Sequence, residues 1–580
     1  MRKEEIRVTP TWELYEKGRN FHHMAGIYTD SQRNYRMYNG NQWEGAKFGD
    51  IEPIQDNFIK PVVKYKVAVI HDNLYSIHYD SQNFESNEFQ KTAVECCKML
   101  NRYAARIWEQ DKMDFKGRRV TKDAAINDEG IIYVDFDLKR MVPVNEIIKK
   151  CDIYYGNENE EDIQRQPYIL IRKRVSVSEA EEMAREAGAS EEEISLIVGD
   201  KDTFEQSGEA SKLELDDNVT LITKLYKKDG TVHSSTTAKL CEIVKEFDTG
   251  LSLYPVAHLN WEEREGSARG EGEVRHLIPN QIEVNRIEFR RLLTVKQQSF
   301  PQKVVLKDRI SNYSAVNAVG GVINVQGQTV DDVNKIISVL KPAQMSPDVV
   351  KLRDDLIQLS RDLAGAGDSA TGQINPETTS GKAILAVQRA SQAPMTEQRE
   401  SFKNFVEDIA RIWLEYIIVH SANGINLERV EIDPDTGRET VRIVLVPQIT
   451  LKQLQATVKI EVTPKSVYDK FAQEQALEAL FTGGYLNVQR LGEFKVFVDA
   501  LDDDSYMPKQ KLLRIIEKME GEQVKIARIE AQGKLLHQKQ MQFLEDDPDG
   551  QAEQIANAQM KQRMQQLMRQ KIQQQNKEVI

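Results

Sequence analysis

Long apolar runs and paired cysteines are both missing from this sequence of 580 residues. No stretch approaches the roughly 20 consecutive apolar residues that a membrane-spanning helix needs, and the opening residues MRKEEIRV lack the apolar core of a secretory signal. The four cysteines, Cys96, Cys97, Cys151 and Cys241, form no Cys-x-x-Cys pair, which is typical of unpaired thiols in a reducing compartment. We therefore expect a protein without a membrane partner that stays soluble where it is made.

Signatures of catalysis are also missing. The nine histidines include no His-Glu-x-x-His pair, and no Gly-x-Ser-x-Gly elbow occurs. The segment GDSATGQI from Gly367 imitates the spacing of a phosphate-binding loop, but Gln373 stands where that loop needs its lysine. Paired acidic residues such as Glu262 and Glu263 fit solvated loops. The sequence thus predicts no active site, no cofactor and no metal site.

An excess of basic residues is missing as well. The sequence has 78 lysines and arginines against 91 aspartates and glutamates, which gives a formal net charge of −13 at pH 7. This charge disfavours tight, non-specific binding of nucleic acid through a broad basic face, although it accommodates local, weak contacts with DNA. The hydrophobic content of 40% and charged content of 29% are typical of a soluble protein, and the length suffices for several domains.

What the sequence does contain is a series of long helical patterns between Gly270 and Arg389. The first includes GEGEVRHLIPNQIEVNR, and the short β-branched runs PQKVVLKDRISNY and AVGGVINVQG after it predict strands in a small insert. A second helix is predicted over 347–364. The polar segment GAGDSATGQINPETTSG follows and has almost no apolar residues, so it suits a surface or a channel. A third helical pattern begins at Gly381.

The second helix carries an apolar stripe, which consists of Val349, Leu352, Leu356, Leu359 and Leu363. The intervals between these residues alternate between three and four, which is the spacing of a heptad seam. The stripe therefore predicts that another helix packs along this one.

The rest of the chain predicts an α+β protein that is predominantly helical. Residues 10–40 have a helical pattern rich in aromatic residues, and 140–265 combine strands with a short helix capped by Ser178. A hairpin is predicted at Asp229 and Gly230, and Pro394 is expected to kink the third helix because proline lacks a backbone donor.

The C-terminal part returns to strands over 426–462, with PDTG at a hairpin turn, and is helical from Ser466 onward. Its last segment is rich in glutamine, with methionine and leucine at helical spacing. This segment fits either helices bundled among several copies or a polar, partly disordered tail.

Four segments, taken in their order along the chain, resemble a known family. YNGNQW at Tyr38–Trp43 is followed by IQDNFIKPVV, then by GEGEVRHLIPNQIEVNR and finally by PETTSGKAILAVQ. Together they resemble landmarks of the tailed-bacteriophage portal proteins, and the resemblance covers most of the chain. It implies a ring, of twelve copies in that family, which sits at one capsid vertex and encloses a central channel.

The resemblance also implies a division of the chain into portal-type parts. These are part of a wing over 1–269, a first stem helix over 270–299, a clip insert over 300–345, a second stem helix over 346–364, a tunnel loop over 365–380, the completion of the wing over 381–465, crown helices over 466–544 and a Gln-rich tail over 545–580. The apolar stripe of the second stem helix would then pack between neighbouring subunits.

Such a ring is a passage rather than a catalyst, so the resemblance implies no enzymatic activity. Double-stranded DNA would move through the channel during packaging and ejection, and a mostly acidic wall would hold it lightly. Candidate DNA contacts are Lys351, Arg353 and Arg361 on the second stem helix and Asp368, Ser369, Thr371, Gln373 and Asn375 in the tunnel loop. For any one of the helix charges, a solvated face or an ion pair between subunits is the simpler explanation.

The implied partners are further copies of the chain, double-stranded DNA, a terminase, a head–tail adaptor, and the major capsid and scaffolding proteins. The implied location is the virion, after synthesis in the cytoplasm of a bacterial host. Two alternatives from other classes stay open here, a terminase-like packaging ATPase and a coiled-coil scaffold suggested by the C-terminal helices. ATP hydrolysis by the isolated protein would favour the first.

Overall fold

The computed structural model describes residues 8–44, 52–81, 87–200, 217–317, 322–326, 337–340, 344–367, 393–422, 424–432, 439–453 and 457–464, with positions 498, 516, 560 and 561. Contacts between residues divide the chain into two units, Met1–Glu431 with Glu439–Lys465 and Ile432–Arg438 with Ser466–Ile580. The helices and strands below belong to the first unit, except for one terminal residue of a strand. They mix α and β structure, as the sequence predicts.

Two helices open the described chain, α1 (Pro10–Met24) and α2 (Ile27–Asn39). Thr9 caps α1 by accepting a hydrogen bond from the backbone N–H of Trp12. The helical pattern over 10–40 is confirmed, with a break at Gly26, whose φ of 73° favours glycine. The following elements are α3 (Ile59–Ile70), β1 (Asn73–Asp80), α4 (Asn87–Gln110) and α5 (Met113–Asn127).

Two antiparallel sheets form the strand-rich part. The first has the order β3-β2-β9, with bounds Val142–Ile148, Glu129–Asp137 and Val256–Asn260. The second has the order β4-β5-β6-β7-β8, with bounds Ile153–Tyr155, Ile169–Ser176, Asn218–Lys228, Thr231–Thr237 and Glu242–Asp248. The 3-10 helices η1 (Lys150–Asp152) and η2 (Ile163–Arg165) flank β4. Neighbouring residues Ile131 and Ile132 of β2 are both fully buried, so both faces of this central strand are covered.

The hairpin predicted at Asp229 and Gly230 is confirmed. Both residues have positive φ, 53° and 88°, as a type I′ turn requires, and they join β6 to β7. The short helix α6 (Val177–Glu186) is confirmed too, but its cap is Ser176 and the prediction of Ser178 was wrong. A cap needs extended backbone, and Ser176 has it because it ends β5, whereas Ser178 lies inside the helix. α7 (Glu191–Ile194) follows α6.

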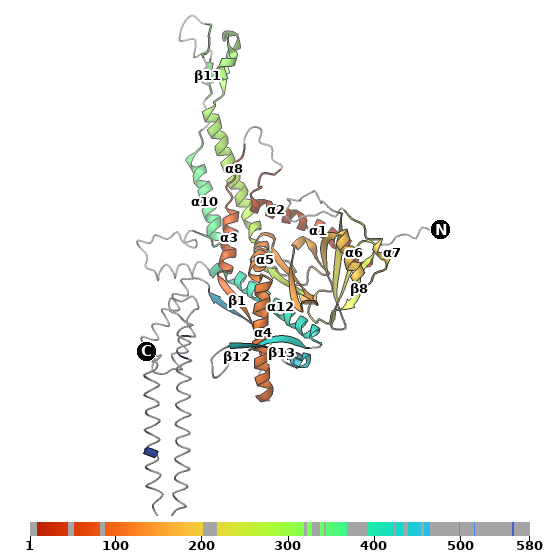
Figure 1. Ribbon diagram of the computed structural model, residues 1–580. Coiled ribbons are helices and arrows are strands. Elements are labelled where there is room, and N and C mark those ends of the chain that lie inside the picture. Colours follow the sequence, from red (N-terminus) through yellow and green to blue (C-terminus); the bar gives the residue numbers. More distant parts are fainter. Residues whose placement is uncertain are drawn as a thin grey trace, which may run out of the picture. The chain divides into compact units, whose positions relative to one another are not determined.

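The two long helices predicted after Gly270 are α8 (Glu273–Ser299) and α10 (Pro347–Leu363). They contact each other and run side by side in Figure 1. Between them lie the paired strands β10 (Lys303–Val305) and β11 (Ile337–Val339) and the 3-10 helices η3 (Lys307–Arg309) and η4 (Tyr313–Asn317). β10 lies in the first of the two β-branched runs, which confirms that prediction. β11 lies beyond both runs, and the described part of the second run, 322–326, contains only an isolated bridge between Val325 and Ile310.

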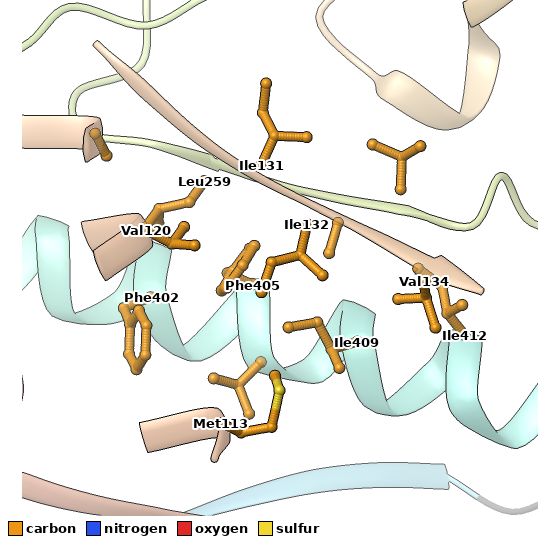
Figure 2. Close-up of a cluster of buried hydrophobic side chains, with 14 of the residues drawn as sticks. Met113, Val120, Ile131, Ile132, Val134, Leu259, Phe402, Phe405, Ile409 and Ile412 are labelled. Atoms are coloured by element: carbon orange, nitrogen blue, oxygen red, sulfur yellow. The ribbon is translucent and has the colours of Figure 1, made fainter. Parts of the chain in front are cut away.

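Helix α12 (Thr396–His420) lies at the centre of the main hydrophobic core. Figure 2 shows Phe402, Phe405, Ile409 and Ile412 of this helix beside apolar side chains of β2, β9 and α5. All four are at most 2% exposed. Burial of a side chain of this size contributes about 1.5–3 kcal/mol, so α12 fixes the position of the first sheet against α5.

Pro394 precedes α12 rather than kinking it. It lies in the 3-10 helix η6 (Ala393–Met395), and α12 begins at Thr396. A proline fits before the first helical turn, where its missing N–H would have no partner within the helix. The residues before Ala393 over which the helical pattern extends, 381–392, lie outside the described residues. So do most of the predicted tunnel loop and nearly all of the predicted crown and tail.

Strands from distant parts of the chain meet after α12. β1 pairs antiparallel with β14 (Thr457–Pro464), so that Asn73 lies opposite Pro464. β12 (Ile425–Ile432) and β13 (Glu439–Val446) form a further two-stranded sheet, and α13 (Gln448–Gln453) lies between β13 and β14 in the chain. The strands predicted over 426–462 are confirmed, while the PDTG turn lies outside the described residues.

Candidate functional site

Helix α8 begins at glycines that the packing requires. The backbone N–H of Gly272, the N-cap, donates a hydrogen bond to Oδ1 of Asp128 at 2.7 Å. A Cβ at Gly272 would lie 2.8 Å from the backbone nitrogen of Asp128, and one at Gly270 would lie 2.6 Å from the carbonyl oxygen of Glu262. Only glycine allows both approaches, which explains the GEG sequence before the helix.

Buried charges surround this start of α8. Arg269 donates to Glu158 through Nε at 2.8 Å and Nη2 at 3.0 Å, and to Glu129 through Nη1. The second carboxylate oxygen of Glu129 lies 2.7 Å from Nε2 of His258. The side chain of Glu129 has no exposed surface, so these partners supply the compensation that a buried carboxylate needs.

The electrostatics of this group fix two protonation states. Burial acts most strongly on Glu129 and favours its neutral form, but Arg269 and His258 outweigh burial and lower the pKa of Glu129 to about 2. Burial, followed by the charge of Arg269, lowers the pKa of His22 to about 2. Nη2 of Arg269 lies 3.0 Å from Nε2 of His22, and since a guanidinium can only donate, that nitrogen accepts. His22 is therefore neutral and Glu129 ionised near neutral pH.

Two lysines attach the first turn of α8 to its surroundings. Nζ of Lys66, on α3, lies 2.5 Å from Oε2 of Glu273, which also accepts a hydrogen bond from Nε1 of Trp261 at 3.3 Å. Lys150, in η1, pairs with Asp128, the residue that caps the helix through Gly272. The negative charge of Glu273 also suits the N-terminus of a helix. The position of α8 is thus set by charges from several elements.

The contact between α8 and α10 includes polar groups. Nε of Arg353 lies 2.6 Å from Oε1 of Glu288, and the Arg353 guanidinium also pairs with Asp56. About two turns away on both helices, Nδ2 of Asn280 donates to Oγ of Ser360 at 2.9 Å. These interactions fix which side of α10 faces α8.

The apolar stripe of α10 divides between this contact and the surface. Leu356 is half-buried and packs against the main core. Leu352, Leu359 and Leu363 are 51%, 53% and 78% exposed, and Val349 is half-buried. Seven and four residues separate the three exposed leucines, so they share one side of the helix. That side is open in the single chain.

The three predicted stem cations differ in exposure and in their ion pairs. Lys351 is exposed and forms no ion pair with another described residue. Arg353 is offset by Glu288, Asp56 and Asp354, and Arg361 is half-buried near the end of α10. Sequence reasoning overlooked these carboxylate partners. The predicted tunnel-loop contacts, Asp368, Ser369, Thr371, Gln373 and Asn375, lie outside the described residues.

Helix α8 carries further cations, which no pattern in the sequence indicated as DNA contacts. Arg286 pairs with Glu283, and Arg291 lies 3.5 Å from Glu288. Arg290 is exposed and forms no ion pair with another described residue. Several positive charges on this helix pair, those of Arg286, Arg291 and Arg353, are therefore offset within the subunit, which would weaken its hold on a polyanion.

The described part of the chain contains no group of three or more His, Cys, Asp or Glu side chains arranged to hold a metal ion. None of the helices in it is both long and apolar enough to cross a membrane.

Comparison with protein families gives a match over the second half of the chain. The family model described as "Phage P22-like portal protein" matches residues 242–579, which is more than half of the chain. The matched region starts in β8 and includes α8, α10 and α12. No curated protein matches the chain.

Proposed function

Because the chain belongs to the phage P22-like portal protein family, we propose that its copies assemble into a closed ring around a DNA channel. As a portal protein it acts in DNA packaging and as the head–tail connector at a vertex of the capsid. In the proposed ring, α8 and α10 are the stem, the insert between them is the clip, and the polar loop after α10 is the tunnel loop. The family match is the observation that carries this proposal.

The exposed leucines of α10 support the ring. A ring of identical chains needs an interface between two different surfaces that closes on itself. Leu352, Leu359 and Leu363 remain exposed although the other side of α10 already packs on α8. Covering one leucine contributes about 1.5–3 kcal/mol, so a neighbouring subunit that covered all three would gain substantial stability.

Replacement of two leucines tests this interface. We expect Leu352→Gln with Leu359→Gln to prevent assembly, so that the solution mass of the purified protein falls from that of a ring toward that of a monomer. Helical content measured by circular dichroism should stay unchanged, because both side chains are already exposed. The matched control is Lys351→Gln with Gln358→Ala, two exposed residues on another side of the same helix. If the leucine variant assembles like the wild type, the stripe is not the subunit interface.

The channel contacts follow from the same arrangement. Lys351 and Arg361 would make weak contacts with DNA. Arg353 would mainly hold α10 in place through its ion pair with Glu288. Asp368, Ser369, Thr371, Gln373 and Asn375 of the tunnel loop would meet DNA directly. Virions whose portal lacks Asp368 to Asn375 should package or retain less DNA than wild-type virions. Unchanged DNA content would contradict the role of the loop.

The proposal includes further partners and an absence of catalysis. The ring, about twelve copies as the resemblance implies, would dock a terminase and a head–tail adaptor and contact the major capsid and scaffolding proteins. It would be made in the cytoplasm of a bacterial host before it enters the virion. Since portal proteins are structural, we expect no cofactor and no ATP hydrolysis. ATP hydrolysis by the purified protein would contradict this and favour a packaging ATPase.

A further inference from the structure

Three helices bring two lysines to one aromatic ring. Tyr38, near the end of α2, is 4% exposed. Nζ of Lys60, at the start of α3, lies 5.8 Å from the centre of this ring, and Nζ of Lys122, on α5, lies 5.1 Å from it. The ring attracts both cations through its negatively charged face and holds them near each other. The two lysines are therefore placed by the fold rather than free to separate.

Further cations extend this group around Asp123. Oδ1 of Asp123 accepts a hydrogen bond from the hydroxyl of Tyr35 at 2.5 Å, so this oxygen is directed toward α2. Burial raises the pKa of Asp123, and the charges of Arg119, Lys122 and Lys149 oppose this effect. These three cations therefore lie near one carboxylate. Together with Lys60 they form a group of four positive charges, named the Tyr38 cluster below.

Asp123 is near three cations of the Tyr38 cluster, but the cluster lacks the close ion pairs that other charges in this chain form. Arg119 and Lys149 are exposed, Lys60 and Lys122 are half-buried, and none of the four forms an ion pair within 4 Å among the described residues. Lys150, which follows Lys149, shows the contrast because it is buried against Asp128. The local sequence KGRRVTK over 116–122 is basic at four of seven positions. Such clustering in a chain of net charge −13 indicates a partner with negative charge.

We propose that the Tyr38 cluster binds the phosphate backbone of DNA, a contact additional to those of the stem and tunnel loop. Three of its four members are lysines, which are depleted in protein–protein interfaces and bind phosphates as point charges. α3 and α5 both contact α8, so the cluster belongs to the elements at the base of the proposed stem. That the polyanion is DNA rests on the proposed portal function. Four cations give a weak, salt-sensitive hold without sequence specificity, which allows DNA to slide.

The test measures binding of a fluorescent DNA duplex of about 30 base pairs to the full-length protein over a range of salt concentrations. The triple variant Lys60→Gln, Arg119→Gln, Lys122→Gln removes three cluster charges. The matched control, Lys139→Gln, Lys228→Gln, Lys245→Gln, removes three exposed charges elsewhere. We expect the cluster variant to bind about tenfold or more weakly at 50 mM salt, with a slope of log affinity against log salt reduced by about 3. The control should match the wild type within about twofold.

A second variant keeps the test valid if the triple variant fails to fold. Arg119→Gln with Lys149→Gln changes two exposed side chains and should reduce the slope by about 2 without altering the circular dichroism spectrum. Equal effects in the cluster and control variants, or no effect in either, would overturn the proposal. So would a cluster variant that loses assembly but keeps its affinity for DNA, since an acidic neighbouring subunit would then be the partner.

The solution mass of each sample separates this proposal from the portal function. If the wild type forms rings and the cluster variants bind DNA normally, the cluster proposal alone fails. If the wild type forms no ring while the cluster variants still lose DNA binding, the ring fails and the phosphate contact stands.

Discussion

Arg353 of α10 and Glu288 of α8 form an ion pair, with 2.6 Å between Nε and Oε1. The Glu288 side chain is only 9% exposed, and the same guanidinium also hydrogen-bonds to Asp56. Burial alone would lower the pKa of Arg353, but the hydrogen bond that it donates to Asp56 and the charges of the nearby carboxylates outweigh burial and raise this pKa above its already high value. The residue that the sequence suggested as a DNA contact is thus engaged inside its own subunit.

Removal of this guanidinium should loosen α10. We expect Arg353→Ala to lower the free energy of unfolding by about 1–3 kcal/mol, because the nearly buried Glu288 loses the nearer of its two cationic partners and keeps only Arg291 at 3.5 Å. Lys351→Ala, two residues earlier and exposed, should change it by less than about 0.5 kcal/mol. Urea unfolding followed by circular dichroism measures both. Similar losses in the two variants would show that the ion pair does not hold α10 in place.

Local features of this fold could be predicted because their causes are local. The heptad spacing, Ser346 as the cap and Pro347 at the first position define α10, and positive φ at Asp229 and Gly230 defines a hairpin. The role of Arg353 could not be predicted in this way. Its partner Asp56 is 297 residues distant in the sequence, and no periodic pattern connects them.

The same limit applies to the apolar stripe and to the base of α8. Periodicity placed Leu356 and Leu359 on one seam, yet only contacts made by distant elements leave Leu359 exposed and bury part of Leu356. Arg269 meets Glu129 across 140 residues and His22 across 247. Such a network has no local sequence signature, because each element contributes a single charged residue.

His22 should make stability depend on pH below about 6.5. Its pKa is lowered from 6.5 to about 2 by burial and by Arg269, so the unfolded chain binds a proton that the folded chain excludes. The stabilisation that comes from keeping His22 neutral is fully present above pH 6.5. Below that pH it is lost, and the free energy of unfolding falls by up to about 1.4 kcal/mol per pH unit. Unfolding free energies at pH 7.0, 6.0 and 5.0 should fall less steeply for His22→Gln than for the wild type. His23→Gln, at the exposed neighbouring residue, is the control, and equal slopes in all three proteins would refute the prediction.

Gly272→Ala should disturb the start of α8. The added Cβ would lie 2.8 Å from the backbone nitrogen of Asp128 and 3.1 Å from the carbonyl oxygen of Ala124, neither of which can rotate away. We expect a loss of about 1–3 kcal/mol in unfolding free energy. A Cβ added by Gly266→Ala would have no atom within 4 Å. This variant should lose only about 1 kcal/mol of unfolding free energy, because residue 266 has a positive φ of 67°. A smaller effect at Gly272 than at Gly266 would contradict the close approach.

Arg269 should be among the most sensitive positions of the first unit. Arg269→Ala leaves Glu129 buried without its main compensating charge and should cost about 3–5 kcal/mol, measured by urea unfolding at pH 7. Arg269→Lys keeps the charge but loses the bidentate pair of hydrogen bonds to Glu158. We therefore expect a loss of unfolding free energy between those of the wild type and Arg269→Ala. Glu129, whose pKa is about 2, contributes stability above pH 4.5 that is lost as pH falls toward 2. Equal stability of Arg269→Ala and the wild type at pH 7 would show that the network is dispensable.

The central claim is that copies of this chain close into a ring. Negative-stain electron microscopy of the purified full-length protein, with its mass measured in the same solution, tests this most directly. The account predicts rings with a central hole and a mass near that of a dozen subunits. Open filaments, or a monomer that hydrolyses ATP, would contradict it.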